Sequence, residues 1–131
     1  DDIRFIMNDG DYLIRDNFYI ICSKIDKYLM FALLNNYYSY YQLEKIGKEY
    51  GGGLLKLQKY DLENIKFPNT TVISQEDNET LKQLAKKLLK AKSNYQKLID
   101  DITKIISHYS DINYDLIKSN YLEKKRSRLE K

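Results

Sequence analysis

The chain has 131 residues, a mass of 15.6 kDa and a formal net charge of +3, which fits one domain or one lobe of a larger protein. Its apolar share of 43% and charged share of 31% are typical of soluble globular proteins, and no apolar run approaches the roughly 20 residues of a membrane span. Cys22 is the only cysteine, which excludes an internal disulfide, and we expect a cytoplasmic protein.

The first 22 residues predict a β-hairpin. Residues 3–7 and 12–22 are rich in Ile, Phe and Tyr, and they flank Asn8-Asp9-Gly10-Asp11, whose residue types suit the positive φ angles of a tight turn. Because the chain begins at Asp1 without an initiator Met and is strand-like from Ile3, we expect it to be a fragment of a longer protein.

Short helices and a short strand are expected next. From Ile25 the apolar residues recur at helical spacing up to a stop at Asn35-Asn36, and a second helix is predicted to run through Leu43 and Lys48 and to end before the glycines at 51–53. A strand over 54–57, a helical turn over 61–65 and a break in the backbone pattern at Pro68 follow.

The last third is predicted to be helical. Ser74 and Asp77 fit a helix N-cap with an acid three residues later, and an apolar stripe follows that predicts packing along other helices. The stripe consists of Leu81, Leu84, Leu88, Ala91, Tyr95, Leu98, Ile102, Ile105 and Tyr109. Residues from Ser110 onward form either a further helix or the end of one long helix, and the pattern leaves that choice open. The expected fold class is α+β, with a small N-terminal β-hairpin and short helices over 1–73 and a long helical part over 74–131.

No motif for catalysis or metal binding is present in the sequence. It contains no GxxxxGKS or GxGxxG loop, no paired cysteines and no HExxH. His108 is the only histidine and is interpreted as a partly exposed helical residue, not as a catalytic base. The acidic residues lie beside lysines along helix faces, as in i,i+4 pairing. We therefore predict no catalytic residue and no metal ligand.

The basic excess is C-terminal. Residues 1–66 contain nine Lys and Arg against ten Asp and Glu, whereas the remainder contains thirteen against nine. Much of the excess is in the tail, in Lys124, Lys125, Arg126, Arg128 and Lys131. Such a run is typical of a solvated helix end, so charge alone does not indicate nucleic-acid binding.

Gly51, Gly52 and Gly53 lie close to several lysines, and this segment is the most unusual in the chain. Bare backbone N–H groups can approach an anion closely, and Lys48 and Lys56 would add positive charge next to a phosphate. A flexible turn between elements is the alternative, and the physical argument by itself favours that turn.

A set of short motifs follows in a fixed order around the glycines. They are Leu33-Leu34-Asn35, Gly51 to Gly53, Leu54 to Leu57, Asp61-Leu62, and Ile65-Lys66-Phe67-Pro68. This order and spacing resemble the C-terminal target-recognition region of adenine-specific (N6) DNA methyltransferases of restriction–modification systems. Residues 15–20 and 95–100 are also similar to that family, so the resemblance covers nearly the whole chain.

The resemblance implies sequence-specific binding of double-stranded DNA. It also implies a separate catalytic domain that binds S-adenosylmethionine and methylates a flipped adenine. The Asn/Asp-Pro-Pro-Tyr/Phe motif of that domain does not occur here, since Pro68 is the only proline. No catalytic residue or cofactor site is therefore carried over, and the isolated chain is expected to be inactive.

The candidate DNA contacts fall into two groups. Gly51, Gly52, Gly53, Lys48 and Lys56 are the candidates for phosphate contacts. Asn8, Arg15 and Gln58 are the candidates for reading base edges, and for Arg15 a local pair with Asp16 or Asp11 is an equal alternative. The tyrosines at 37, 38, 40 and 41 are expected to pack in the core.

Other functions stay open at this point. Half of a type I restriction specificity subunit would also join a DNA-reading lobe to long helices. A helical interaction module without DNA binding is a third possibility, and it predicts behaviour that does not depend on salt. Besides DNA and the catalytic domain, the apolar stripe allows a restriction endonuclease subunit or a second copy of the chain as a partner.

Overall fold

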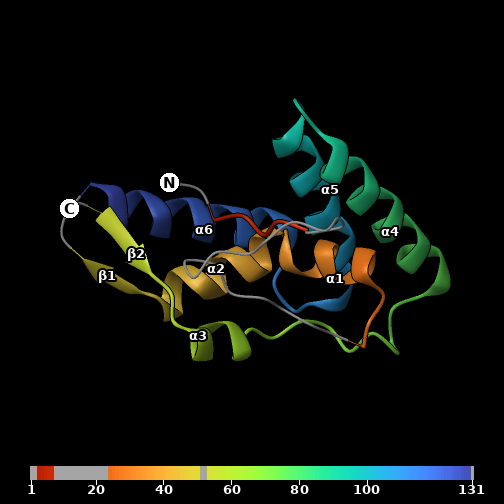
Figure 1. The fold of residues 1–131 in the computed structure, drawn as a ribbon, viewed down its shortest axis with the longest axis horizontal. Coiled ribbons are helices and arrows are strands. Elements are labelled where there is room, and N and C mark those ends of the chain that lie inside the picture. Colours follow the sequence, from red (N-terminus) through yellow and green to blue (C-terminus); the bar gives the residue numbers. More distant parts are fainter. Residues whose placement is uncertain (1–2, 8–23, 51–52, 131) are drawn as a thin grey trace.

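The fold is described from a computed structural model over residues 3–7, 24–50 and 53–130. Its elements are α1 (Lys27–Leu34), α2 (Tyr37–Ile46), β1 (Lys48–Tyr50), β2 (Leu54–Lys56), α3 (Lys59–Glu63), α4 (Gln75–Lys90), α5 (Tyr95–Ile106), a 3-10 turn (Ser107–Tyr109) and α6 (Tyr114–Leu129). In Figure 1 the β1–β2 pair lies at one end of the long axis and α4 at the other, with α2 and α6 between them. The expected α+β class is confirmed.

Side-chain caps set the beginnings of the first two helices. Asp26 Oδ1 accepts hydrogen bonds from the backbone N–H groups of Tyr28 (2.9 Å) and Leu29 (3.2 Å) at the start of α1. Asn36 Oδ1 accepts one from Ser39 N (3.1 Å) at the start of α2. Each cap satisfies N–H groups that have no partner within the helix. The predicted stop at Asn35-Asn36 is therefore confirmed, and the second asparagine also starts the next helix.

Asn35 holds the N-terminal segment in place, and the prediction that this segment is a strand is wrong. The backbone N–H of Phe5 donates to Asn35 Oδ1 at 3.0 Å, and Asn35 Nδ2 donates to Phe5 O at 3.3 Å. A side-chain amide thus takes the place of a neighbouring strand, and residues 3–7 form no strand. The rest of the predicted hairpin, residues 8–22, lies outside the described residues.

A short antiparallel pair of strands lies on either side of the glycines. The second helix ends at Ile46, so the prediction that it includes Lys48 is wrong, and Lys48–Tyr50 forms β1. β1 pairs with β2 in the register Lys48↔Lys56, Glu49↔Leu55 and Tyr50↔Leu54. The predicted strand at 54–57 and helical turn at 61–65 correspond to β2 and α3.

The long apolar stripe is divided between two helices. Ser74 Oγ accepts from Asp77 N at 3.1 Å, which confirms the predicted cap of α4. That helix ends at Lys90, and Asn94, in the left-handed region at φ 61°, precedes α5. A single helix through the stripe is therefore wrong, because the chain turns back on itself at 91–94. The alternative left open after Ser110 is resolved in favour of a separate helix, α6, which is capped by Asn113.

One main core is shared by the two halves of the chain. It contains apolar side chains from α1, α2, α4, α5 and α6, including Leu33, Leu81, Ile102 and Ile117. Tyr37 and Tyr40 are buried there beside Tyr121, as predicted for the tyrosine cluster. Burial raises the pKa of Tyr37 to about 12, so this phenol stays protonated at neutral pH. The division of the chain at residue 73 stays a prediction, and both parts contribute to the same core.

Candidate nucleic-acid interface

Two lysines lie directly opposite each other on the β1–β2 pair. Lys48 is the Cα partner of Lys56, and both side chains are exposed. Residues paired in this way project from the same face of the sheet, with Cβ atoms about 4.5–5.5 Å apart. The two ammonium groups therefore concentrate positive charge on one small exposed face.

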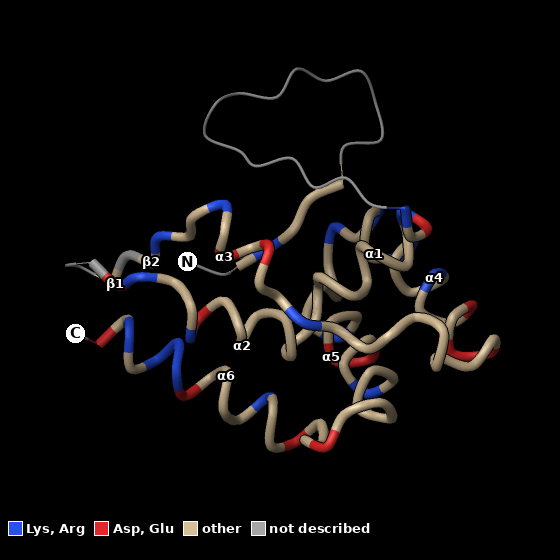
Figure 2. Tube along the Cα trace, turned by 90° about the horizontal axis from the view of Figure 1, so that it is seen from below, with Lys and Arg blue, Asp and Glu red and all other residues tan. Residues whose placement is uncertain are grey.

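The other face of the strand pair is turned toward α6. Side chains alternate along a strand, which puts Glu49 on the face opposite Lys48. There Glu49 Oε1 lies 3.9 Å from Lys124 Nζ of α6. Figure 2 shows the Lys and Arg residues of β1, β2 and the C-terminal half of α6 at the same end of the molecule.

Gly53 is a packing residue at the start of β2. Its φ of +76° lies in the left-handed region, and a Cβ atom here would come within 3.2 Å of Arg128 O and 3.3 Å of Leu129 Cα. Both neighbours are backbone atoms of α6, so they cannot move aside cheaply. Gly53 therefore allows the strand pair to sit against the end of α6, and its role as a phosphate contact stays a prediction.

A buried ion pair joins the same three elements. Arg128 Nε and Nη2 donate to the two carboxylate oxygens of Glu44 at 2.9 and 2.8 Å, and Arg128 Nη1 donates to Gly53 O. Glu44 is 1% exposed and Arg128 is 3% exposed. Because the guanidinium binds both the carboxylate of α2 and the carbonyl before β2, it fixes the position of the strand pair relative to the helices.

The sequence did not indicate this pair. Glu44 lies in a tyrosine-rich helix, and Arg128 is 84 residues away in the tail. The prediction that the tail cations form a solvated helix end is wrong for Arg128. Arg126 fits that prediction better, because its side chain is exposed and its Nε lies 4.0 Å from Glu130 Oε1. Lys118 is likewise used internally, since its Nζ lies 3.0 Å from Asp100 Oδ1 and this contact raises the pKa of Lys118.

The remaining predicted contacts are placed only in part. Gln58 is half-buried at the start of α3, where its backbone N–H donates to Asp61 Oδ2 at 2.6 Å. Asn8, Arg15, Gly51 and Gly52 lie outside the described residues. Within the described part of the chain, the predicted phosphate contacts that lie together on an exposed face are Lys48 and Lys56.

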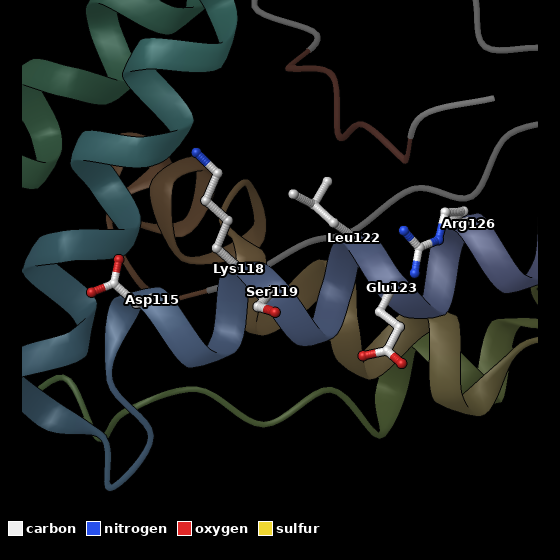
Figure 3. Close-up of a pocket in the computed structure, with 6 residues that line it drawn as sticks. All are labelled: Asp115, Lys118, Ser119, Leu122, Glu123 and Arg126. Carbon is white, nitrogen blue, oxygen red and sulfur yellow. The ribbon is translucent and has the colours of Figure 1, made fainter.

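A hollow of about 450 Å³ lies on α6. It is lined by Asp115, Lys118, Ser119, Leu122, Glu123 and Arg126. Figure 3 shows these six side chains pointing in different directions from a single helix, so they do not converge on one point where a substrate could be held. His108 is exposed, as predicted, and its Nδ1 lies 3.3 Å from Asp77 Oδ2.

Neither a metal-binding cluster nor a membrane-spanning helix is found among the described residues. No group of three or more His, Cys, Asp and Glu side chains among them is arranged to hold a metal ion. None of the helices formed by these residues is both long enough and apolar enough to cross a membrane.

Comparison with known proteins identifies the family. Residues 1–107 match the model of the family described as type II methyltransferase M.Eco57I, C-terminal domain. No curated protein and no solved structure matches the chain significantly. The matched region contains α1 to α5 and both strands, whereas α6 lies beyond it. Because the match covers most of the chain, the chain belongs to the family of the C-terminal domain of the type II methyltransferase M.Eco57I.

Proposed function

We propose that this chain is the DNA-reading domain of an adenine-N6 DNA methyltransferase of a restriction–modification system. In this proposal it binds double-stranded DNA and positions it for a catalytic domain elsewhere in the enzyme. S-adenosylmethionine binding and methyl transfer belong to that catalytic domain, so no residue of the chain is assigned to the cofactor. Membership of a type II methyltransferase family supports the assignment.

The observation that carries the proposal is the pairing of Lys48 with Lys56. Residues directly opposite each other on a strand pair project from the same face, so the two lysines place their ammonium groups side by side. A phosphate oxygen placed between the two ammonium groups would accept a charge-assisted contact from each of them.

The buried ion pair gives this face a fixed position. Arg128 holds Gly53 O and Glu44 together, so the strands carrying Lys48 and Lys56 are anchored to α2 and α6. Contacts to phosphates set the register of a protein on the duplex, whereas base edges carry the sequence information. In the proposal, the lysines therefore orient the domain, and base reading falls to polar side chains beside them, with Gln58 the described candidate.

A salt titration tests the DNA contact. The chain is titrated against a fluorescein-labelled duplex of mixed sequence at salt concentrations from about 50 to 200 mM, and log K is plotted against log salt. Losing two phosphate contacts should make the slope of log K against log salt less steep by about 1.8. Over that roughly fourfold range of salt, the affinity of wild type should therefore fall by a factor about 12 times larger than that of Lys48→Gln/Lys56→Gln.

The matched control is Lys59→Gln/Lys66→Gln. It removes the same charge from exposed residues of the neighbouring segment, and Lys59 lies 4.0 Å from Glu63. The control should keep the wild-type slope. Equal slopes for all three proteins would reject the lysine face as a contact, and binding that ignores salt would favour a helical interaction module instead.

The methyltransferase containing this domain tests the adenine assignment. Nucleoside mass spectrometry of its DNA product should detect N6-methyladenine, and 5-methylcytosine alone would reject the assignment. In the same enzyme, Lys48→Gln/Lys56→Gln should raise the KM for DNA and leave the KM for S-adenosylmethionine unchanged, because the lysines touch only the DNA.

A further inference from the structure

The tip of the α4–α5 hairpin has an unusual charge pattern. Residues 80–99 contain six lysines and no Asp or Glu. They run from the second turn of α4 through the turn at 91–94 into the first turns of α5. Figure 1 shows this tip standing clear of the body of the fold, away from β1 and β2.

The lysines lie on the outer face of the hairpin. Leu81, Ala85 and Leu88 are buried against the core, whereas Lys86, Lys87, Lys90 and Lys92 are exposed. Lys86 and Lys90 are spaced i,i+4, and like charges at this spacing destabilise a helix. Lys87 and Lys90 in the last turn of α4 do complement its dipole, but the helix dipole gives no reason for Lys86 one turn earlier.

Few carboxylates balance this charge. In the part of the chain that the structure describes, no carboxylate lies within ion-pair distance of Lys87, Lys90 or Lys92. On α6, in contrast, Lys118 and Lys124 lie beside Asp100 and Glu49.

Neighbouring elements add to the positive charge. Arg4 lies over the ring of Tyr95 with 4.2 Å to its centre, at the first residue of α5. Lys27 Nζ and Lys86 Nζ each lie 5.1 Å from the centre of the Tyr28 ring, which joins the start of α1 to α4. The start of α5 carries no acid in its first turn and no side-chain cap from Asn94. Arg4 and the start of α5 thus add positive charge next to the turn at 91–94, and Lys27 adds positive charge beside Lys86.

We propose that this lysine tip, defined as Lys86, Lys87, Lys90 and Lys92, is a second contact surface for duplex DNA that grips the phosphate backbone independently of base sequence. The inference rests on the proposed function and adds a second phosphate contact to it. The tip presents exposed lysines, and residues 80–99 contain no arginine, the residue that most often reads base edges. Of the exposed amides nearby, at Gln83, Asn94 and Gln96, the last already donates to the Tyr37 hydroxyl. Its contribution is therefore affinity and orientation over a longer stretch of DNA.

The test compares two variants of equal charge in the complete 131-residue chain. Lys87→Gln/Lys90→Gln/Lys92→Gln removes three cations of the lysine tip, and Lys59→Gln/Lys66→Gln/Lys104→Gln removes three exposed cations elsewhere. Both are titrated with the labelled duplex of mixed sequence, and their melting temperatures are checked against wild type. Loss of three phosphate contacts reduces the salt slope by about 2.7, so wild type should lose about 40-fold more affinity than the tip variant between about 50 and 200 mM salt.

The outcomes separate this inference from the proposed function. If the tip variant keeps the wild-type slope while Lys48→Gln/Lys56→Gln lowers it, the tip is not a contact and the proposed function stands. If wild type does not bind the duplex at about 50 mM salt, both proposals fall. If the tip variant lowers affinity on one duplex sequence and has no effect on unrelated sequences, sequence-independent gripping is overturned.

Discussion

Replacing Arg128 with Met removes the cation that holds the end of α6 to α2 and to Gly53. Glu44, at 1% exposed, then loses the guanidinium that binds both of its carboxylate oxygens in the core. Removing one partner of such a buried pair costs about 3–5 kcal/mol. For a chain of this size about 1 kcal/mol corresponds to about 4 °C, so the melting temperature should fall by about 12–20 °C. Chemical denaturation at neutral pH measures the same loss as a lower midpoint.

A double variant separates the charge from the packing. Glu44→Leu/Arg128→Met removes both charges and fills the space with apolar groups, so it should recover most of the stability that Arg128→Met loses. The control is Lys59→Met, which breaks a pair whose side chains are 79% and 64% exposed and should leave the midpoint close to wild type. The reasoning is refuted if Arg128→Met unfolds at the wild-type midpoint, or if the double variant is no more stable than the single one.

Three smaller changes test other parts of the fold. Gly53→Ala should destabilise the chain by roughly 1–2 kcal/mol in denaturant, because the new Cβ sits at positive φ against the backbone of α6, and an unchanged midpoint would contradict the close packing. Ser74→Ala should cost about 1 kcal/mol and lower the helical signal in circular dichroism, since Ser74 Oγ caps α4, and no change would show that the cap is dispensable. The hydrogen bond from the Tyr109 hydroxyl holds the pKa of Asp77 below its ordinary 3.8. The ionised Asp77 therefore stabilises the fold above pH 3.8, and this stabilisation is lost as the pH falls through the lowered pKa. Tyr109→Phe should therefore reduce the difference in stability between neutral and acidic pH, and an unchanged difference would remove Asp77 as its source.

Local capping explains why several helix boundaries could be predicted. Asn36 and Ser74 accept hydrogen bonds from N–H groups three residues later, and this pattern is visible in a short window of sequence. The turn at 91–94 was missed because it has no glycine or proline. Asn94 in the left-handed region was the available signal, since asparagine is among the few residues that adopt it readily.

Contacts between distant residues explain the main errors. Residues 3–7 have strand-forming side chains, but Phe5 pairs with the Asn35 side chain 30 positions away, and no local pattern announces that partner. The same holds for Glu44 and Arg128, which are 84 positions apart. An arginine in a basic tail has the same local signature whether it is solvated or buried.

The charge pattern of the hairpin tip was readable from the sequence. Counting charge over the whole second half of the chain concealed it, because the acids of 100–130 offset the lysines of 80–99. Only the division of the stripe into α4 and α5 brings Lys86 to Lys92 together on a protruding turn. Net charge over a segment is a poor guide when the fold separates its parts.

Lysine footprinting is the most direct test of DNA reading by this domain. The chain is acetylated with a limiting reagent, free and saturated with duplex DNA at low salt, and the modification of each lysine is measured by mass spectrometry. The account predicts protection of Lys48 and Lys56 together with the lysine tip, and unchanged reactivity at Lys59 and Lys104. Unchanged reactivity at Lys48 and Lys56 in the saturated complex would contradict it.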